Sequence, residues 1–362
     1  MILASHDVNH NLWNSAIIDA GFQGTIFQTT HWAEFLKKSY GDRPTYLMSI
    51  DKKGNPQSLL LAMESCYAKH PSSTLLGKKG FLFGQLYQKI LSPMIFKVSP
   101  FIFWENGPIF LNKNENAFAD ILRQVTIRAQ ELGCYEIKFA RPAYFADNNR
   151  LFFSFGFSST RMGTFLVSLG KSEEELFSSI DKSSRKNIRK IEQEAVIRQA
   201  FRLHELEEFY RLHVESSNRL GTKIFPFSFF NSLWNFFSSS EQVVLFIAYY
   251  KDKPIGAIMC LAFNKTVHEN FVADSNYARE NRIYASDILK WHALKWANEK
   301  GYSYFDLSGV ELQKIDEGNE KARNIYRFKS KWGGQLVNFN DYQQSFRANK
   351  LKTLGYFLSD SI

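Results

Sequence analysis

The residues best suited to chemistry lie between positions 302 and 339, near the end of the chain. This stretch contains a Phe328–Lys329 pair, with Tyr326 and Trp332 close by. A fixed cation lowers the barrier to amine attack on an acyl carbon, because it stabilises the oxyanion that forms. Aromatic neighbours lower the local dielectric constant and strengthen this interaction. Lys329 is therefore a candidate catalytic cation; the alternative is an ordinary surface lysine on a short helix.

Proton transfer needs a second group, and Asp306 stands in a predicted strand of the same stretch. Its carboxylate either accepts a proton from the attacking ammonium or caps the following loop. His268, beside Glu269, is a weaker candidate base, because a structural role is commoner for such a histidine. The sequence has no GxSxG, Walker A, GxGxxG or HExxH motif, and its eight histidines form no metal-ligand cluster. No nucleophile and no metal site are thus predicted.

A strongly basic segment, residues 180–195, is the clearest electrostatic feature. Ile180, Ile188, Ile191 and Ala195 fall near one face of a helix, so the helix can pack while its other side stays cationic. Arginine suits phosphate oxygens because its guanidinium is a planar fork. The segment is either a phosphate-binding helix or a solvated charged face. Its basic residues are Lys182, Arg185, Lys186, Arg189 and Lys190.

Length and charge limit the class of protein. At 362 residues the chain is comfortable for two domains. Its formal net charge of +9 favours anionic partners such as nucleic acid, phosphorylated co-substrates or an anionic membrane surface. Its 3 cysteines lie far apart without zinc or CxxC spacing, which predicts reduced thiols in a cytoplasm. The first residues lack the pattern of a signal peptide.

No run of about 20 apolar residues is long enough to span a membrane. Residues 81–103 come nearest, but Lys89, Pro93, Lys97 and Pro100 interrupt them. This segment is either an interfacial patch for a lipid-linked substrate or a pair of buried strands with a loop.

Hydrophobic periodicity predicts an α+β fold in which two units of similar order follow each other. The first unit is predicted to contain a helix at 32–40 capped by Thr29 or Thr30, a hairpin at 45–50 and 58–63, a strand region at 101–111, a helix at 116–132 and a strand at 135–139. The second is predicted to contain a strand at 164–169, helices at 172–195, 203–217 and 227–238, a three-strand meander at 243–250, 255–263 and 266–274, and a helix at 286–300 capped by Ser286. A strand that ends at 308–309, a short basic helix and a last strand at 335–339 complete it.

Several motifs resemble those of the Fem-type aminoacyltransferases, the peptidoglycan-bridge enzymes within the GNAT acyltransferase superfamily. The basic segment SSRKNIRKIEQEAV is similar to the family's KxRxxIRKAxKxGV. Similar matches are IFQTTHWAEFL at 26–36, the Gly107-Pro108 pair, ILKWHALKWANEKGYSYFDLSGV at 288–310 and RFKSKWGG at 327–334. They follow the family's order from about residue 26 to 340.

The resemblance implies two tandem GNAT-like domains, each a mixed and mostly antiparallel sheet flanked by helices. The domains are expected at 1–160 and 161–345, followed by a tail at 346–362. A cleft between the domains and direct acyl transfer to an amine are also implied. By the match to the family's FK motif, Lys329 stabilises the transition-state charge, with Phe328 beside it and Asp306 as a further catalytic candidate.

The resemblance also implies binding residues. Arg282 joins the basic segment as a candidate for donor phosphates, although the loop before residue 286 lacks the glycines of a pyrophosphate-binding RxxGxG/A motif. Sugar-nucleotide-binding relatives contact the acceptor with an arginine and then a tyrosine. Here Arg219 is kept and phenylalanines follow, and the family's N-terminal lysine falls at Leu36. The acceptor-binding candidates are Lys37, Arg219, Phe225, Phe229 and Tyr284.

These observations predict a cytoplasmic N-acyltransferase that forms an amide on an amino group of a cell-envelope precursor. The leading donor is an aminoacyl-tRNA, in peptidoglycan synthesis, with no permanently bound cofactor and with possible peripheral membrane contact. The alternative is an acyl-CoA-dependent enzyme that acts on an amino sugar or amino acid in surface-polysaccharide synthesis. A third reading, of another class, is a catalytically silent binding protein that keeps the fold for nucleic-acid or membrane contact.

Overall fold

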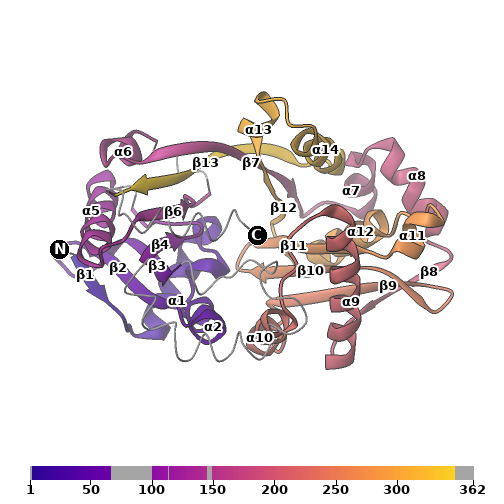
Figure 1. Cartoon of the computed structure of the whole chain (residues 1–362), viewed down its shortest axis with the longest axis horizontal. Helices are drawn as coiled ribbons and strands as arrows, with labels where there is room; N and C mark the ends of the chain where they lie inside the picture. Colours follow the sequence, from indigo (N-terminus) through magenta and orange to yellow (C-terminus); the bar gives the residue numbers. More distant parts are fainter. Residues whose placement is uncertain (1, 67–99, 113, 145–148, 347–362) are drawn as a thin grey trace, which may run out of the picture. The chain divides into compact units, whose positions relative to one another are not determined.

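The computed structural model describes residues 2–66, 100–112, 114–144 and 149–346 (Figure 1). The described chain divides into two compact units. The first unit holds the residues up to Arg161 together with those from Phe339 on, and the second holds Met162–Asn338. Each unit is a sheet flanked by helices, so the predicted α+β class is confirmed.

The sheet of the first unit has the order β1-β2-β3-β4-β6-β13. Its neighbours are antiparallel except for β4 and β6, which are parallel and enclose the helix α5 in sequence. The short strand β5 (Ile109–Phe110) pairs with β3. The strands are β1 (Ile2–Ser5), β2 (Arg43–Ile50), β3 (Pro56–Cys66), β4 (Pro100–Trp104), β6 (Glu136–Ala140) and β13 (Gln335–Ser345).

The sheet of the second unit repeats this plan in the order β8-β9-β10-β11-β12-β7. The antiparallel meander β9-β10-β11 is confirmed, and the parallel pair is β11 with β12, which enclose the helix α12 in sequence. The strands are β7 (Ser158–Ser168), β8 (Ala195–Gln199), β9 (Val243–Tyr250), β10 (Lys253–Phe263), β11 (Thr266–Asp274) and β12 (Tyr304–Val310). The predicted duplication thus extends to the direction of each strand pair.

The last strand of each sheet is exchanged between the two halves of the sequence. β7 follows the first unit in the chain, but its residues 163–168 pair with β12. β13 follows the second unit, but Tyr342, Gln344 and Ser345 pair with β6. The two units are therefore connected by two strands, each of which begins in one unit and completes the sheet of the other.

Two helices of the first unit, α2 and α5, lie close to the predicted positions, whereas α1 and α6 were not predicted. α2 begins after Thr29, whose side chain accepts a hydrogen bond from the amide of Trp32, and ends at Gly41, which has the left-handed conformation (φ 68°). The helices are α1 (His10–Asp19), α2 (Thr30–Tyr40), α5 (Glu115–Glu131) and α6 (Asn149–Ser154).

In the second unit, α12 and α8 pack against each other, while α9 and α10 contact β9. The longer helices are α7 (Glu173–Ser179), α8 (Lys182–Ile191), α9 (Leu203–Leu220), α10 (Phe227–Phe237), α12 (Ala285–Glu299) and α14 (Glu320–Lys329). The shorter ones are α11 (Asn276–Glu280) and α13 (Leu312–Asp316).

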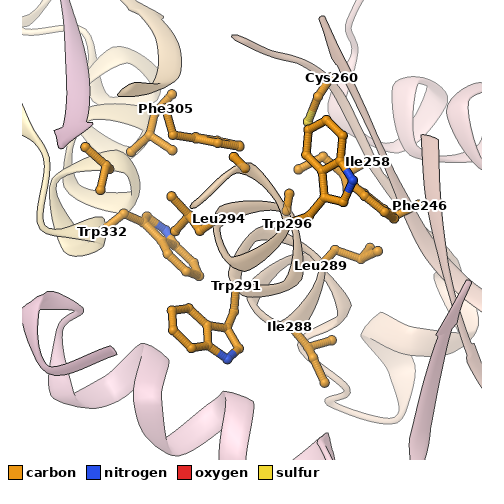
Figure 2. Close-up of a cluster of buried hydrophobic side chains, with 14 of the residues drawn as sticks. Phe246, Ile258, Cys260, Ile288, Leu289, Trp291, Leu294, Trp296, Phe305 and Trp332 are labelled. Carbon is orange, nitrogen blue, oxygen red and sulfur yellow. The ribbon is translucent and has the colours of Figure 1, made fainter. Parts of the chain in front are cut away.

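The core of the second unit forms around α12 (Figure 2). Trp291, Leu294 and Trp296 of this helix are buried with Phe305 of β12 and Trp332, which follows α14. Because α12 is buried on nearly all sides, it lies inside the unit and fixes the strands and helices that surround it.

The structure corrects several predictions about the second unit. The helix predicted at 172–195 is two helices, because Ile180 is extended (ψ 143°) and Asp181 caps α8 through the amide of Ser183. The strand β8 then begins at Ala195, where Val196 and Ile197 favour extended backbone.

The other errors concern element ends. β7 begins at Ser158 and not at 164, and β13 continues to Ser345 and not to 339. Ser286 is not the N-cap of α12, which begins one residue earlier, although Asp287 lies in the first turn as predicted. β12 does not end at 308–309 but continues to Val310, because an extra residue forms a bulge between the pairs Asp306–Leu166 and Gly309–Thr164.

The apolar segment predicted at 81–103 lies outside the described residues as far as position 99. Among the helices that the structure describes, none is both long and apolar enough to cross a lipid bilayer.

Candidate active site

Lys329 is fixed at the bulge of β12. It is the last residue of α14, a helix that begins after Asn319, whose side chain caps the amide of Ala322. Ser308 takes a left-handed conformation (φ 65°), and the carbonyl oxygens of Ser308 and Gly309 each accept a hydrogen bond of 3.0 Å from Lys329 Nζ. An ammonium has three N–H donors, so one remains for an additional acceptor.

The surroundings of Lys329 weaken its hold on its proton. Burial lowers the pKa of the Lys329 ammonium to about 8, and the nearby Lys290 ammonium acts in the same direction. The carboxylates of Glu269 and Asp306 oppose this decrease. Below pH 8 the group is still predominantly a cation, as the predicted oxyanion-stabilising role requires.

Asp306 holds the bulge together. Its Oδ1 accepts a hydrogen bond of 2.8 Å from the Ser308 amide and another from the Thr164 hydroxyl. Its Oδ2 lies 3.4 Å from Nδ1 of the buried His268 on β11. This is the capping role that the sequence left open, and the role as proton acceptor stays a prediction.

A buried ion pair beside the motif was missed at the sequence level. Lys290 of α12 is 0% exposed, and its Nζ lies 3.0 Å and 2.9 Å from the two carboxylate oxygens of Glu269 on β11. The same ammonium lies 4.6 Å from the centre of the Phe328 ring. The sequence offers no clear signal for this pair, because other polar residues of α12 alternate with its apolar ones.

The basic segment forms α8 as a partly exposed cationic helix. Ile188 and Ile191 are buried in the core, whereas Arg185 is half-buried and Arg189 is exposed, with its guanidinium 5.2 Å from the Phe177 ring. The Nε of Arg185 is buried and makes no hydrogen bond. The other basic residues, Lys182, Lys186 and Lys190, are exposed.

A carboxylate lies at the N-terminal end of α12, where a bound pyrophosphate would favour positive charge. Asp287 is buried in the first turn of α12, and its Oδ2 accepts a hydrogen bond of 2.7 Å from Asn187 of α8. Burial raises the pKa of Asp287. Arg282, in the loop before α12, is exposed and has a positive φ of 53°.

Two acceptor candidates, Lys37 and Arg219, form local contacts within their own units. Lys37 is exposed on α2 and pairs with Glu34 at 3.2 Å. Arg219, near the end of α9, donates 2.6 Å to Asn276 Oδ1 and 3.0 Å to the Asp274 carbonyl oxygen. Tyr284 is 45% exposed immediately before α12.

The other two acceptor candidates belong to an aromatic cluster. The rings of Phe225 and Phe229 lie 5.0 Å apart, and Phe225 lies 5.5 Å from Phe271 of β11. His213 of α9 accepts a hydrogen bond from the Phe225 amide, and burial lowers its pKa to about 4, so it is neutral. This cluster is apolar, whereas a site for a sugar nucleotide needs several polar side chains.

Among the described residues, no group of three or more His, Cys, Asp or Glu side chains is arranged to hold a metal ion.

Residues 178–330 match the family model described as an acetyltransferase (GNAT) domain, and these residues include α8, β11, α12 and Lys329. A comparison with curated proteins finds no match.

Solved structures resemble the whole chain. FemX has a TM-score of 0.73 and 13% sequence identity, over 98% of this chain and 100% of FemX. A tandem GNAT protein from the clavulanic acid biosynthesis pathway has a TM-score of 0.54 and 7% identity, over 96% of this chain and 100% of that protein. L-PGS from Bacillus licheniformis has a TM-score of 0.53 and 13% identity, over 96% of this chain and 95% of that one.

These similarities confirm the two GNAT-like units that the motifs predicted. The basic helix, the parallel strand pair with its central helix and the Phe328–Lys329 motif all lie within the matched domain. The protein is therefore an acyltransferase with a GNAT domain in its second unit, and its fold is similar to that of FemX.

Proposed function

We propose that the protein transfers an aminoacyl group from an aminoacyl-tRNA to an amino group of a cell-envelope precursor, in peptidoglycan synthesis. The neutral acceptor amine attacks the ester carbonyl, the C–N bond forms, and the ester C–O bond breaks to release the tRNA hydroxyl. The ammonium proton of the attacking amine passes to that leaving oxygen through a base or water. Such a reaction needs an oxyanion-stabilising cation but no enzyme nucleophile.

The observation that carries this proposal is the fixed Lys329 ammonium. Two carbonyl oxygens orient it, its third N–H is available for the oxyanion, and burial places it in a medium of lowered dielectric constant. The similarity to FemX supports a Fem-type reaction, and the cationic face of α8 suits the phosphates of an RNA donor.

An acyl-CoA donor is the second candidate, for an enzyme acting on an amino sugar or amino acid. The match to an acetyltransferase domain favours it. The buried Asp287 in the first turn of α12 opposes it, because a carboxylate there repels a pyrophosphate at the helix N-terminus. We therefore prefer aminoacyl-tRNA to acyl-CoA as the donor, because of the Asp287 carboxylate at this helix end.

A transfer assay distinguishes the donors. The protein is incubated with radiolabelled aminoacyl-tRNA or acyl-CoA and with a panel of amines that includes muramyl peptides, lipid-linked precursors, amino sugars and amino acids. Transfer from charged tRNA is expected, and transfer from acyl-CoA alone would replace the first proposal by the second. Transfer from neither donor to any acceptor would contradict both.

The role of Lys329 is tested in the same assay. Lys329→Ala is expected to lower kcat by roughly 100-fold or more, because it removes the cation from the oxyanion. Lys321→Ala, on the exposed side of the same helix, is the matched control and should keep full activity. Unchanged turnover in Lys329→Ala would remove this lysine from the mechanism.

A further inference from the structure

The ion pair between Lys290 and Glu269 contacts the Phe328–Lys329 motif, yet the proposed mechanism does not use it. Both carboxylate oxygens of Glu269 lie within 3.0 Å of Lys290 Nζ. The rings of Phe328 and Trp332 lie 4.6 Å and 5.2 Å from the same ammonium. Rings at these distances attract a desolvated cation through their electron-rich faces.

Stability alone does not account for this pair. Moving an ammonium from water into a protein core is unfavourable, and replacing a buried ion pair by packed apolar side chains is often neutral or stabilising. The Lys290 side chain is fully buried and lies against the rings of Phe328 and Trp332, so an apolar residue would suit the position. The electrostatic effect of the buried charge on nearby groups explains its presence better.

The neighbour in question is Lys329. The charged groups that act on its ammonium come from three elements: Glu269 from β11, Lys290 from α12 and Asp306 from β12. The next cation along the chain, Lys331, donates to the Ser183 hydroxyl. Glu269 is thus a counter-ion shared by two lysines, and Lys290 is a like charge fixed close to the catalytic candidate.

Glu269 also reaches the bulge through its backbone. Its carbonyl oxygen accepts a hydrogen bond from the Ser308 hydroxyl, and the Ser308 carbonyl oxygen accepts one from Lys329 Nζ. The side chain of Glu269 therefore influences the charge of Lys329, while its backbone helps to hold the oxygen to which Lys329 binds.

We propose that Lys290 and Glu269 are positioning residues for acyl transfer: Lys290 holds the Phe328 ring, and the pair sets the charge of the Lys329 ammonium at the bulge. The catalytic part of this inference rests on the proposed function. The coupling of the pair to Lys329 is a property of the protein without substrate, and it is tested first.

The ionisation of Lys329 is measured directly by trace labelling with acetic anhydride at a series of pH values. Only the neutral amine reacts, so the yield of the labelled Lys329 peptide, measured by mass spectrometry, follows its deprotonation. Lys290→Met removes the like charge and leaves Glu269 to Lys329, so labelling below the midpoint should fall roughly 3- to 10-fold. Glu269→Gln removes the shared counter-ion, so labelling should rise by a similar factor.

Lys300→Met is the matched control. It breaks the exposed pair of Lys300 with Glu241 (2.7 Å) at the end of the same helix and should leave the Lys329 profile unchanged. If Lys290→Met does not fold, the two substitutions are combined in a double variant with Glu269→Gln. This double variant contains no unpaired buried charge at either position. Labelling in the double variant must then be lower than in Glu269→Gln.

Identical Lys329 profiles in all folded variants would overturn the coupling. Where the wild type transfers an acyl group, the alkaline limb of kcat/KM should move in the same directions as the labelling midpoint. A limb that stays in place while the labelling shifts would overturn the catalytic role. If the wild type transfers nothing, the proposed function fails, whereas the labelling still decides the coupling.

Discussion

At the scale of single residues, one extra residue in β12 gives Lys329 its environment. The left-handed Ser308 interrupts the ladder between β12 and β7, and its carbonyl oxygen and that of Gly309 bind the ammonium. Asp306 stabilises the same bulge through the Ser308 amide. A bulge of this kind directs polar groups to a place that a regular strand does not offer.

The lowered pKa of Lys329 predicts opposite effects of alkaline pH on activity and stability. In the proposed mechanism the active form of Lys329 is the cation, so kcat/KM should fall about tenfold per pH unit above pH 8. The unfolded lysine keeps its proton up to its ordinary pKa, so between pH 8 and about 10.4 the unfolded state binds more protons and the Lys329 contribution to folding stability rises with pH.

Both trends are measurable, the first by pH–rate profiles and the second by urea unfolding at each pH. Lys329→Arg is the control for the first, because arginine stays charged and should remove an alkaline limb near pH 8 from whatever activity remains. A limb that persists in this variant would assign the titration to another group.

The sequence allowed only part of this site to be predicted. Phe328 and Lys329 were recognised from their isolated pairing and aromatic neighbours. Lys290 and Glu269 were not, because their 21-residue separation conceals a contact that depends on α12 packing against β11. The bulge was mistaken for a strand end, since Ser308-Gly309 resembles a turn and only the pairing with β7 distinguishes the two.

At the scale of elements, α8 combines two roles on one short helix. Its isoleucines anchor it to the core around α12, so its cationic side is held by a rigid support. Asp181 caps its first turn, and Lys331 donates from beyond α14 to its Ser183 hydroxyl. The helix is thus tied to the element that carries Lys329.

Removing the two arginines of α8 should weaken donor binding. Arg185→Ala with Arg189→Ala is expected to lower tRNA affinity and to reduce the slope of log Kd against log salt by about 1 to 2, because each phosphate contact releases about one counter-ion. The affinity is measured by filter binding between 50 and 200 mM salt. Lys52→Ala with Lys53→Ala, in an exposed turn, makes the same change in net charge and should leave the slope unchanged.

In the first unit, the motif around Gln28 is structural. Its side-chain amide donates to the carbonyl oxygens of Leu61 and Glu105 (3.3 and 2.7 Å) and accepts 2.8 Å from the Leu61 amide. A Cβ at Gly107 would lie 2.9 Å from Gln28 Nε2, so the IFQ and Gly-Pro motifs recognised in the sequence depend on each other.

Gln28→Leu should destabilise the first unit by about 2–4 kcal/mol, because it removes the side chain that hydrogen-bonds to the buried backbone of Leu61. Gln130→Leu, on the exposed side of α5, is the control and should change stability by less than about 0.5 kcal/mol. The free energy of unfolding of each variant is measured by urea titration, and hydrogen exchange shows which of the two units is destabilised. Equal stability of the two variants would show that the hydrogen bonds of Gln28 are dispensable.

At the scale of the whole molecule, the exchange of β7 and β13 means that each compact unit includes a strand from the other half of the sequence. Periodicity revealed two units of similar order, because hairpins, capped helices and the meander are local patterns. It did not reveal the exchange, because β6 and β13 are about 200 residues apart and any of several strands could have completed either sheet. Within the first unit, Tyr342 of β13 is buried and stacks on Phe152 at 3.8 Å, and Arg141 pairs with Asp341 at 2.9 Å.

Tyr342→Ala should therefore destabilise the first unit, although the residue lies 20 positions from the end of the sequence. Loss of this buried ring is expected to cost about 3–5 kcal/mol. Hydrogen exchange should show faster exchange in β6 and α6 than in β9 and β10. Gln343→Ala, whose side chain is exposed, is the control. Uniform loss of protection in both units would mean that they unfold as one.

The exchanged strands also determine when the first sheet can be completed during synthesis. When residues 1–161 have left the ribosome, β6 still lacks β13, and the whole second unit must be translated before β13 is made. At translation rates of about 5–20 residues per second, that edge stays unpaired for on the order of ten seconds or more. An open edge is a template for wrong pairing with other chains. The newly made first half of this enzyme is thus a predicted client of chaperones until the last strand arrives.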